Sequence, residues 1–346
     1  MARAWFHLKV PALHNTDMDK KITLAHGNGG RLMHELIDKL RLNFSNKFLD
    51  ELSDAAELKV PVKRLAFSTD SYVVKPLFFP GGDIGKLSIC GTVNDIAMKG
   101  ARPLFISLAF IIEEGLEFKV FEKIVKSIRD AAKKAKVLVV TGDLKVVEKG
   151  AADKIYINTS GIGIIENKET RVGSKARQGD LIVINGLIAE HGLCIFNERE
   201  DLGFKSEIKS DCASLNFITE KCQRASKDIS VMRDPTRGGL ATALNEIAKS
   251  SNLGIEIDEK KIPIRPVVKK MCDVLGFDPL YIANEGKFIC FVKAKDAHKV
   301  KRAMGEKAAI IGRVTTSCKG EVVLNTTIGA KRILSVLEVD QLPRIC

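Results

Sequence analysis

The spacing of apolar positions predicts that short strands and amphipathic helices alternate along most of the chain. Short apolar runs predict strands, and the longest, 103–112, has the length of a buried strand and not of a membrane span. Apolar residues three and four positions apart predict helices, with 117–136 as the clearest case. For the first half of the chain the pattern predicts strands at 22–25, 65–68, 103–112, 137–140 and 154–165 and helices at 31–42, 87–98 and 117–136.

A polar, charged stretch at 166–179 interrupts this pattern and predicts a boundary between two domains. A chain of 346 residues is also too long for one ordinary core. We expect domains at 21–165 and 180–338, with an N-terminal extension at 1–20 and a mobile tail at 339–346. In the second domain the pattern predicts strands at 181–184, 287–293, 309–314 and 321–324, helices at 190–199 and 213–225, and a helix that follows the turn at 231–240 and ends at 250.

Composition narrows the class of protein. Apolar residues make up 45% of the chain, which is typical of a globular protein, and the first residues lack the apolar core of a secretory signal. The eight cysteines form no CxxC pair, so the sequence indicates reduced thiols and neither a zinc ribbon nor a disulfide framework. We therefore expect a cytoplasmic protein that does not bind a membrane.

The net charge of +12 raises the question of nucleic-acid binding. Aromatic residues are only 6% of the chain, and they do not alternate with basic residues as in surfaces that stack bases. We expect no nucleic-acid partner, and interpret the charge as a solvated basic surface that also attracts nucleotide phosphates. Many of the lysines fall on predicted helix faces, as do Lys119, Lys123, Lys126, Lys133, Lys134 and Lys136.

Three aspartates each follow an apolar segment, and they are the main candidates for chemistry. Asp70 and Asp143 come where strands are predicted to end, and Asp95 follows Asn94 inside an otherwise apolar helix. A buried carboxylate is costly unless it meets a cation or hydrogen-bond donors, and a structural salt bridge would satisfy Asp95 alone. Gathered carboxylates repel one another, and Mg²⁺ bound to phosphate oxygens relieves that repulsion. The three residues together predict a magnesium–phosphate site.

Several turns carry further candidates, each with a plain structural alternative. The glycine-rich turn at 26–30 and the turn before Gly238 both open helices, where backbone N–H groups favour phosphate. Asp234, in the second of these turns, is a fourth candidate ligand or a helix cap. Asp83 can cap the helix that follows it, and Glu285 is either a general base or a turn residue.

The last five residues, 342–346, end in a thiol at Cys346. Pro343 fixes its own φ and favours an extended Leu342, so this segment has the form of a stiff arm that carries a nucleophile. The plain alternative is a chain end without a function. What decides between them is whether the body of the protein holds a site for the arm to reach.

Six motifs in this order resemble the carbamoyl dehydratases of [NiFe]-hydrogenase maturation, within the superfamily of aminoimidazole ribonucleotide synthetase, selenophosphate synthetase and thiamine-monophosphate kinase. The resemblance covers about 21–346, and it rests on LAHGNGGRLMHELI, FSTDSYVVKPLFFPGGDIGKLSICGTVNDIAMKGARP, VTGDLKVVEKG, MRDPTRGGLATALNEIA, YIANEGK and the terminal PRIC. It implies two α+β domains with mixed sheets and helices packed on them. It also implies a homodimer whose first-domain strands form a shared barrel, with nucleotide clefts near the interface.

The resemblance implies an activity. A carbamoyltransferase partner would place a carbamoyl group on Cys346, ATP would phosphorylate the carboxamide oxygen, and loss of phosphate would leave a thiocyanate. An iron-binding scaffold complex would then accept the cyanide. Phosphorylation is chemically reasonable because an amide oxygen leaves poorly and phosphate leaves well.

The resemblance also assigns roles to residues of this chain. Lys145 and Glu285 would contact the carboxamide or remove its proton. Leu144 stands where the family usually has Thr, and Asn28 where a smaller residue is common, so no hydroxyl at 144 is available to touch phosphate. Magnesium would be held by Asp70, Asp95, Asp143 and Asp234, and ATP by these four with Asp83, Asn94 and Gly238.

Two alternatives remain at this stage. One is a sibling enzyme that makes selenophosphate or closes a purine ring, although no cysteine precedes Cys90, where a selenophosphate synthetase would need one near its N-terminus. The other is a non-catalytic nucleotide-binding scaffold that docks maturation partners.

Overall fold

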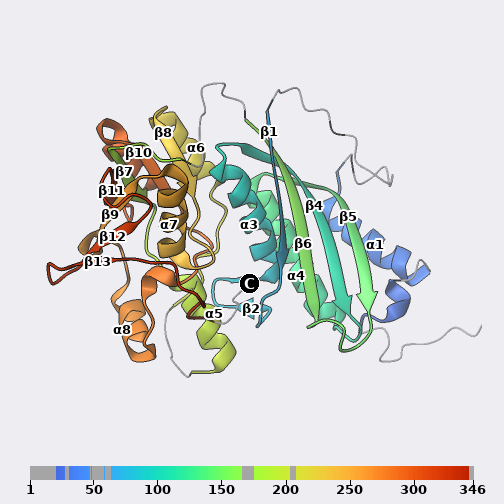
Figure 1. Cartoon of the computed structure of the whole chain (residues 1–346). Helices are drawn as coiled ribbons and strands as arrows, with labels where there is room; N and C mark the ends of the chain where they lie inside the picture. The colour runs from blue at the N-terminus through green and yellow to red at the C-terminus, as the bar shows by residue number, and fades with distance from the viewer. Residues whose placement is uncertain are drawn as a thin grey trace, which may run out of the picture.

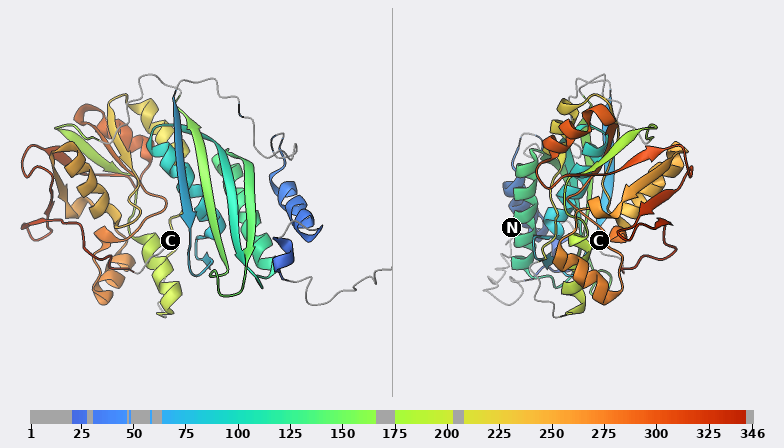
Figure 2. Two further views of the ribbon diagram at one scale, coloured as in Figure 1. Left: turned by 45° about the vertical axis from the view of Figure 1, so that its right-hand side comes forward. Right: turned by 90° about the vertical axis from the view of Figure 1, so that its left-hand side faces the viewer.

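The computed structural model describes residues 21–27, 31–46, 48, 58, 64–165, 175–202 and 208–342. Two sheets lie in separate halves of the molecule (Figure 1, Figure 2). The first sheet has four strands in the order β1-β6-β4-β5, in which β4 and β5 are parallel and the other pairs are antiparallel. Its strands are β1 (Leu65–Tyr72), β6 (Ile155–Ile164), β4 (Arg102–Glu113) and β5 (Leu138–Val147).

The second sheet has seven strands in the order β13-β12-β9-β11-β7-β10-β8. Only the pair of β12 and β9 is parallel, so both sheets are mixed, as an α+β fold predicts. The strands are β7 (Asp180–Ile184), β8 (Ile229–Arg233), β9 (Gly254–Asp258), β10 (Ile289–Lys293), β11 (Ala309–Thr315), β12 (Val322–Asn325) and β13 (Lys331–Ile333).

Helices cover these sheets, and a two-stranded hairpin, β2 (Phe78–Phe79) with β3 (Gly82–Asp83), precedes the helix α3. The α-helices are α1 (Arg31–Phe44), α3 (Ile84–Met98), α4 (Phe118–Ala135), α5 (Glu190–Glu200), α6 (Asn216–Ala225), α7 (Gly239–Ser251), α8 (Pro266–Leu275) and α9 (Ala297–Met304). Short 3-10 turns are η2 (Leu24–His26), η3 (Glu259–Lys261), η4 (Pro279–Tyr281) and η5 (Ala294–Asp296).

Helix α3 joins the two halves of the molecule. It is apolar on nearly all sides because it packs on β1 and β6 on one side and on α6 and β8 of the other half. Close packing on β6 requires glycine there: a Cβ at Gly161 or Gly163 would lie 2.6 or 2.3 Å from the side chain of Ile96. The two glycines therefore allow α3 to lie close to the backbone of β6. One continuous core therefore spans both halves.

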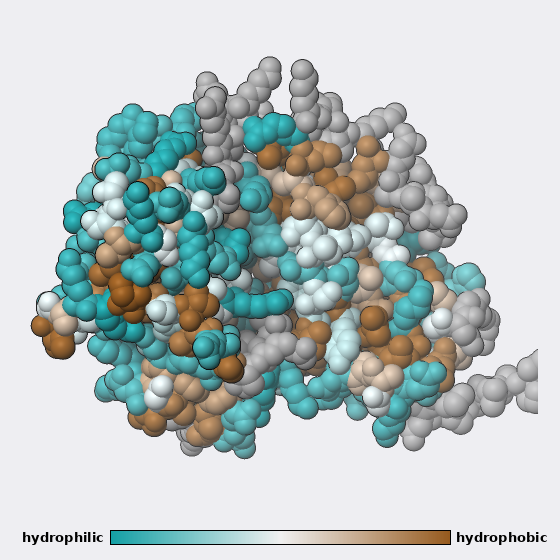
Figure 3. All heavy atoms as spheres, in the orientation of Figure 1, coloured by the Kyte–Doolittle hydropathy of each residue, from teal (hydrophilic) through white to brown (hydrophobic). Residues whose placement is uncertain are grey.

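The two faces of the four-stranded sheet differ in what covers them. The inner face, with Tyr72, Ile157 and Phe110, packs against helices. The outer face leaves Leu65 and Phe67 53% and 70% exposed. Figure 3 shows hydrophobic side chains gathered over the upper part of this face. The part of the outer face around Leu65 and Phe67 is an apolar surface without a covering element among the described residues.

Several predicted boundaries are wrong. The predicted strand at 22–25 is the 3-10 turn η2, and α6 begins at Asn216 and not at 213. Strands β1 and β5 continue past their predicted ends, so that Asp70 and Asp143 lie within strands. The reason is tertiary: β6 and β4 supply backbone partners across these polar residues, and pairing overrides the local breaker signals. The apolar pattern did not predict the strands β2, β3, β8, β9 and β13 or the helices α8 and α9.

No helix in the described part of the chain is long and apolar enough to cross a membrane. Near the C-terminal end, Gln341 accepts a hydrogen bond from the backbone N–H of Asp278 at 2.6 Å, and Leu342 is buried. The predicted tail therefore departs later than 339, because its first residues are packed against the second half of the molecule. The terminal PRIC, with Cys346, lies outside the described residues.

Candidate functional site

Helix α3 and strand β1 bring two of the predicted aspartates together at the junction of the two halves. Asp70 and Asp95 share a side-chain hydrogen bond. The Ser68 hydroxyl donates to Asp95 Oδ2 at 2.6 Å, and the Tyr72 hydroxyl donates to Asp70 Oδ2 at 3.3 Å. Both carboxylates are therefore held by donors on β1, at positions that alternate along its inner face. Ser68 and Tyr72 were not singled out from the sequence.

Asp234 joins this pair from the other half of the molecule, directly after β8. Burial raises its pKa to about 7, and the negative charges of Asp95 and Asp70 add to the effect. Burial also raises the pKa of Asp70, again with a contribution from Asp95. The positive charge of Arg237 acts in the opposite direction and lowers the pKa of Asp70. We call Asp70, Asp95 and Asp234 the acid cluster.

The acid cluster fits a magnesium ion held together with phosphate. The negative charge of Asp95 contributes to the raised pKa of both Asp70 and Asp234, and a divalent cation is the group that relieves such repulsion. Within the described residues, no group of three or more His, Cys, Asp or Glu side chains is already arranged to hold a metal alone. Mg²⁺ ordinarily takes one or two carboxylates and completes its coordination shell with phosphate oxygens and water.

A buried chain of hydroxyls fixes the tyrosine beside the acid cluster. The Tyr72 hydroxyl lies 3.2 Å from Thr92 Oγ1, which lies 2.6 Å from Thr159 Oγ1. Thr159 donates to the carbonyl of Ser88 at 2.9 Å. Gly91 makes room for this arrangement, since a Cβ there would lie 2.3 Å from the Tyr72 hydroxyl. Burial raises the pKa of Tyr72 well above its usual value, so the hydroxyl remains a donor to Asp70.

Gly238 and Gly239 form the start of α7, close to Asp234. Both have positive φ, +66° and +60°, and Gly238 is the N-cap residue, so Asp234 does not cap this helix. A Cβ at Gly239 would lie 2.6 Å from the backbone of Leu280, which means that glycine also allows η4 to pack here. The positive end of α7 therefore opens a few residues from the acid cluster, where a phosphate is favoured.

Asp83 and Asn94 are both engaged by groups of the chain itself. Asp83 caps α3 by accepting from the N–H groups of Gly85 and Lys86 at 2.8 and 3.0 Å, which confirms the cap predicted for it. Asn94 accepts from Leu215 N at 2.7 Å and donates to the carbonyls of Ala213 and Glu285 at 3.1 and 3.3 Å. Contacts of either side chain with ATP remain predictions.

Glu285 is buried, and its backbone is fixed from two sides. Asp211 accepts from the N–H groups of Glu285 and Gly286 at 3.0 and 3.2 Å, and it forms an ion pair with Lys287 at 3.0 Å. The Asp211 and Lys287 side chains are only 2% and 13% exposed. The negative charge of Glu285 contributes to the raised pKa of Tyr72, which places Glu285 at the same junction as the acid cluster. No local pattern in the sequence pointed to Asp211.

Asp143 and Lys145 lie apart from the acid cluster. They form an ion pair at 2.8 Å with their side chains 58% and 61% exposed, and the hydrogen bond from Lys145 lowers the pKa of Asp143. Strand register connects Asp143 through Ala109 and Asn158 to Ser71, so it lies on the outer face, three strand spacings or about 14 Å from β1. Within one chain, therefore, Asp143 does not join the other three aspartates, and its role as a magnesium ligand stays a prediction. Leu144 faces inward and is part of the core.

The last described residue lies close to the segment that carries Glu285. Leu342 and Ile282 both approach Gly192, whose N–H donates to the carbonyl of Ala283 at 3.1 Å. Cys346 comes four positions after Leu342, and an extended chain of four residues spans at most about 14 Å. The segment that carries Cys346 therefore begins beside the site. The predicted glycine turn at 28–30 lies outside the described residues.

Comparison with known proteins defines the class first. The model described as AIR synthase related protein, N-terminal domain, matches residues 52–165, and the model of the C-terminal domain matches residues 177–325. The two matches together cover most of the chain, so the chain is a two-domain AIR synthase-related protein.

Individual relatives define the family within that class. The chain is 44% identical over 337 residues to the carbamoyl dehydratase HypE of Rhodobacter capsulatus, which covers 95% of this chain and 99% of the relative. A crystal structure of hydrogenase maturation protein HypE in complex with ATP superposes with a TM-score of 0.90 at 47% identity, over 94% of this chain and 99% of that one. A HypE–HypF complex superposes with a TM-score of 0.77 at 45% identity, over 89% and 100%. The chain belongs to the HypE family of carbamoyl dehydratases, which confirms the resemblance inferred from its motifs.

Proposed function

We propose that this protein is an ATP-dependent carbamoyl dehydratase of hydrogenase maturation that acts on a carbamoyl group carried by its own Cys346. Its family membership and the ATP bound to a 47% identical relative support the class of reaction. The single structural observation that supports it most is the acid cluster. Three carboxylates from both halves of the molecule crowd together beside the start of α7.

In this proposal the acid cluster binds magnesium and the phosphates of ATP. When bound, magnesium neutralises phosphate charge, which is what phosphoryl transfer needs. Asp95 and Asp70 face it from α3 and β1, and Asp234 faces it from the segment before α7. Tyr72 orients Asp70 through its hydroxyl, and Ser68 orients Asp95. The protein's main contribution is to position the triphosphate.

Cys346 brings the carboxamide to this site. The carboxamide oxygen takes the terminal phosphate of ATP, and ADP is released. The phosphate then leaves from the carboxamide carbon as the nitrogen loses its protons, and a thiocyanate remains on the sulfur. Glu285 is positioned to accept a proton, because Asp211 and Asn94 hold its backbone and leave its carboxylate at the junction. The anchored Leu342 sets the reach of the arm.

A second copy of the chain would complete the site. Asp143 and Lys145 belong to the expected site but lie on the outer face of the sheet, where Leu65 and Phe67 are also exposed. Pairing two such apolar faces buries them and brings Asp143 and Lys145 of one subunit toward the acid cluster of the other. We therefore propose a homodimer with sites shared between its subunits.

Two further partners follow from the activity. A carbamoyltransferase must load Cys346, and the relative found in complex with HypF supports a maturation partner of this kind. An iron-binding scaffold complex would accept the cyanide.

Removal of the last four residues tests the proposed carrier. We expect the truncated protein, and the variant Cys346→Ala, to bind ATP with unchanged affinity and to form no thiocyanate. Ring closure by an aminoimidazole ribonucleotide synthetase would survive this truncation, and a pure scaffold would show no phosphate release even with a carbamoylated tail. Thiocyanate found on any other cysteine would contradict the assignment.

A further inference from the structure

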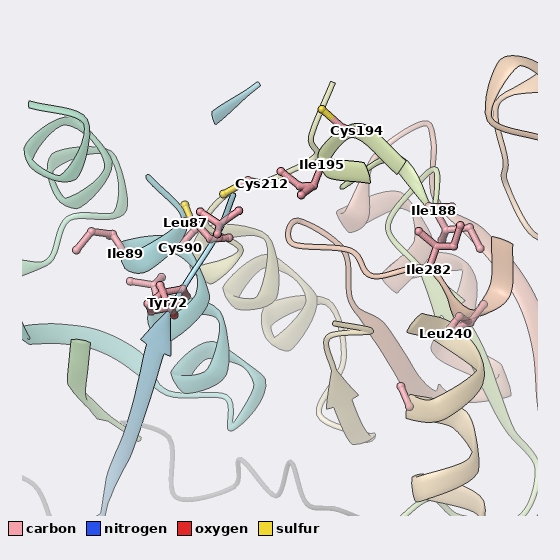
Figure 4. Close-up of a cluster of buried hydrophobic side chains, with 14 of the residues drawn as sticks. Tyr72, Leu87, Ile89, Cys90, Ile188, Cys194, Ile195, Cys212, Leu240 and Ile282 are labelled. Atoms are coloured by element: carbon pink, nitrogen blue, oxygen red, sulfur yellow. The ribbon is translucent and has the colours of Figure 1, made fainter. Parts of the chain in front are cut away.

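A pair of cysteines that the proposed reaction does not use lies at the junction of the two halves. Cys90 is on α3, and Cys212 is on the segment that precedes α6. Figure 4 shows their side chains pointing toward one another, and a hydrogen bond joins the two thiols. The backbone confirms this proximity independently: Asn94, one turn further along α3, bonds to Ala213, the residue after Cys212.

A cavity of about 420 Å³ leads to this pair from the surface between α3 and α4. Cys90 and Ala213 line it, together with four lysines: Lys86, Lys123, Lys126 and Lys134. A small oxidant that enters this cavity therefore meets Cys90 first and finds Cys212 behind it.

The two thiols differ in reactivity. The hydrogen bond from Cys212 lowers the pKa of Cys90, and the charges of Lys86 and Lys134 lower it further. The same hydrogen bond, with burial, raises the pKa of Cys212 well above its usual value. Cys90 also lines the cavity and Cys212 does not, so Cys90 is the sulfur that meets the oxidant and Cys212 is the thiol that resolves its oxidised form.

We propose that Cys90 and Cys212 form a peroxide-sensitive dithiol site. The Cys90 thiolate attacks one peroxide oxygen, the O–O bond breaks, and Cys90 becomes a sulfenic acid while hydroxide leaves and takes up a proton. The Cys212 thiol then attacks the Cys90 sulfur, water leaves, and the disulfide forms. Overall, two thiols and one hydrogen peroxide give one disulfide and two waters, and a dithiol reductant reverses the change.

A Cys90–Cys212 disulfide would affect the segment that positions Glu285. Asp211, which holds the backbone of Glu285, is the neighbour of Cys212 in sequence. A bond between Cys90 and Cys212 would link α3 covalently to the segment that positions Glu285. The inference does not depend on the proposed function, because it concerns the thiols alone.

The chain offers a matched control pair. Cys222 and Cys290 are also buried neighbours, and the charge on one acts on the other. Burial raises the pKa of Cys222 to about 12, and no cation contributes to the shift of either thiol. This second pair should resist oxidation under conditions that oxidise the first.

The test is peptide mapping by mass spectrometry of the native full-length protein after treatment with hydrogen peroxide. We expect a Cys90–Cys212 disulfide, seen as the loss of two hydrogens and reversed by dithiothreitol, while Cys222 and Cys290 stay reduced. In Cys212→Ser we expect Cys90 to react with a dimedone probe, which labels sulfenic acids. In Lys134→Gln we expect disulfide formation to slow about two- to tenfold.

Two results would overturn the proposal. One is a reduced Cys90–Cys212 pair at a peroxide dose that fully oxidises the exposed Cys318. The other is a Cys222–Cys290 disulfide that forms as fast as the first, since this would show general unfolding by the oxidant. Circular dichroism of Cys212→Ser establishes that the variant is folded before the dimedone result is interpreted.

Discussion

Asp234 is the residue whose protonation depends most on what occupies the site. Burial is the main cause of its raised pKa of about 7, so its carboxyl group titrates near neutral pH. Bound magnesium would require its carboxylate form, so metal binding and proton release are linked at this residue. Asp70 is affected in the same direction.

This linkage predicts how stability changes with pH. The unfolded pKa of Asp is about 3.9, so between about pH 4 and pH 7 the native state holds a proton that the unfolded state has lost. The contribution of Asp234 to stability is therefore complete below about pH 4 and is lost as the pH rises through 7. Without metal or nucleotide, we expect Asp234→Asn to melt at a higher temperature than wild type at pH 8, with the difference vanishing near pH 4.

Thermal melts of both proteins across this range check the sign. Magnesium with a non-hydrolysable ATP analogue should stabilise the wild type more at pH 8 than at pH 5, and should stabilise Asp234→Asn less. A melting-temperature difference that does not vary with pH would contradict the assignment.

Asp211 is the residue on which the backbone of Glu285 depends. Replacing it with Ala leaves Lys287 almost buried without its counter-ion, and two backbone N–H groups lose their acceptor. We expect Asp211→Ala to lower the free energy of unfolding by about 3–5 kcal/mol. Denaturant titration measures this, with Glu220→Ala as the control.

The control removes an exposed ion pair of the same charge type. Glu220 pairs with Arg224 at the surface of α6, and its loss should cost less than about 1 kcal/mol. Equal effects of the two substitutions would mean that the Asp211–Lys287 pair has no special role.

At the scale of elements, α3 determines the geometry of the site, because it carries Asp95 and reaches both halves. Its seat on β6 depends on glycine, since a Cβ at Gly163 would also lie 2.9 Å from the carbonyl oxygen of Arg102. We expect Gly163→Ala to destabilise the protein by about 1–3 kcal/mol through overpacking. Ser160→Ala, on the outer face of the same strand, should change stability by less than about 1 kcal/mol. If both substitutions lowered the free energy of unfolding equally, the close contact between α3 and Gly163 would not be important for stability.

The sequence predicted the helix α3 and marked Asp95 within it for a physical reason. A charged residue within an otherwise apolar helix must be satisfied by something, and Asp95 stood out on that ground. The strand ends were predicted poorly, because the breaker signals around Asp70 and Asp143 are local while the pairing of β1 and β5 is tertiary. The residues that hold Asp95 and Glu285, such as Ser68 and Asp211, left no local pattern at all.

At the scale of the whole molecule, the separation of Asp143 from the acid cluster is the main difference from expectation. A period-two pattern tells which residues share a face of a strand, but it does not tell which face a second chain covers. The exposed Leu65 and Phe67 mark the face that a second subunit would cover. The shared site can be tested by mixing two inactive variants.

Asp95→Asn and Asp143→Asn would each be inactive as homodimers. If sites are shared, a mixed dimer has one site with both changes and one with neither. Random mixing should then restore about a quarter of wild-type activity. No recovery, despite subunit exchange shown by native mass spectrometry, would mean that the two residues act within one subunit. An active Asp143→Asn homodimer would mean that Asp143 has no role.

ATP-dependent dehydration of a carbamoyl group on the terminal thiol can be followed by intact-mass analysis after incubation with the carbamoylating partner and ATP. We expect Cys346 first to gain a carbamoyl group and then to lose one water, and we expect Asp95→Asn to stop after the first step. A carbamoylated protein that keeps its full mass with ATP and magnesium present, or that loses water equally in Asp95→Asn, would show that the acid cluster does not drive this dehydration.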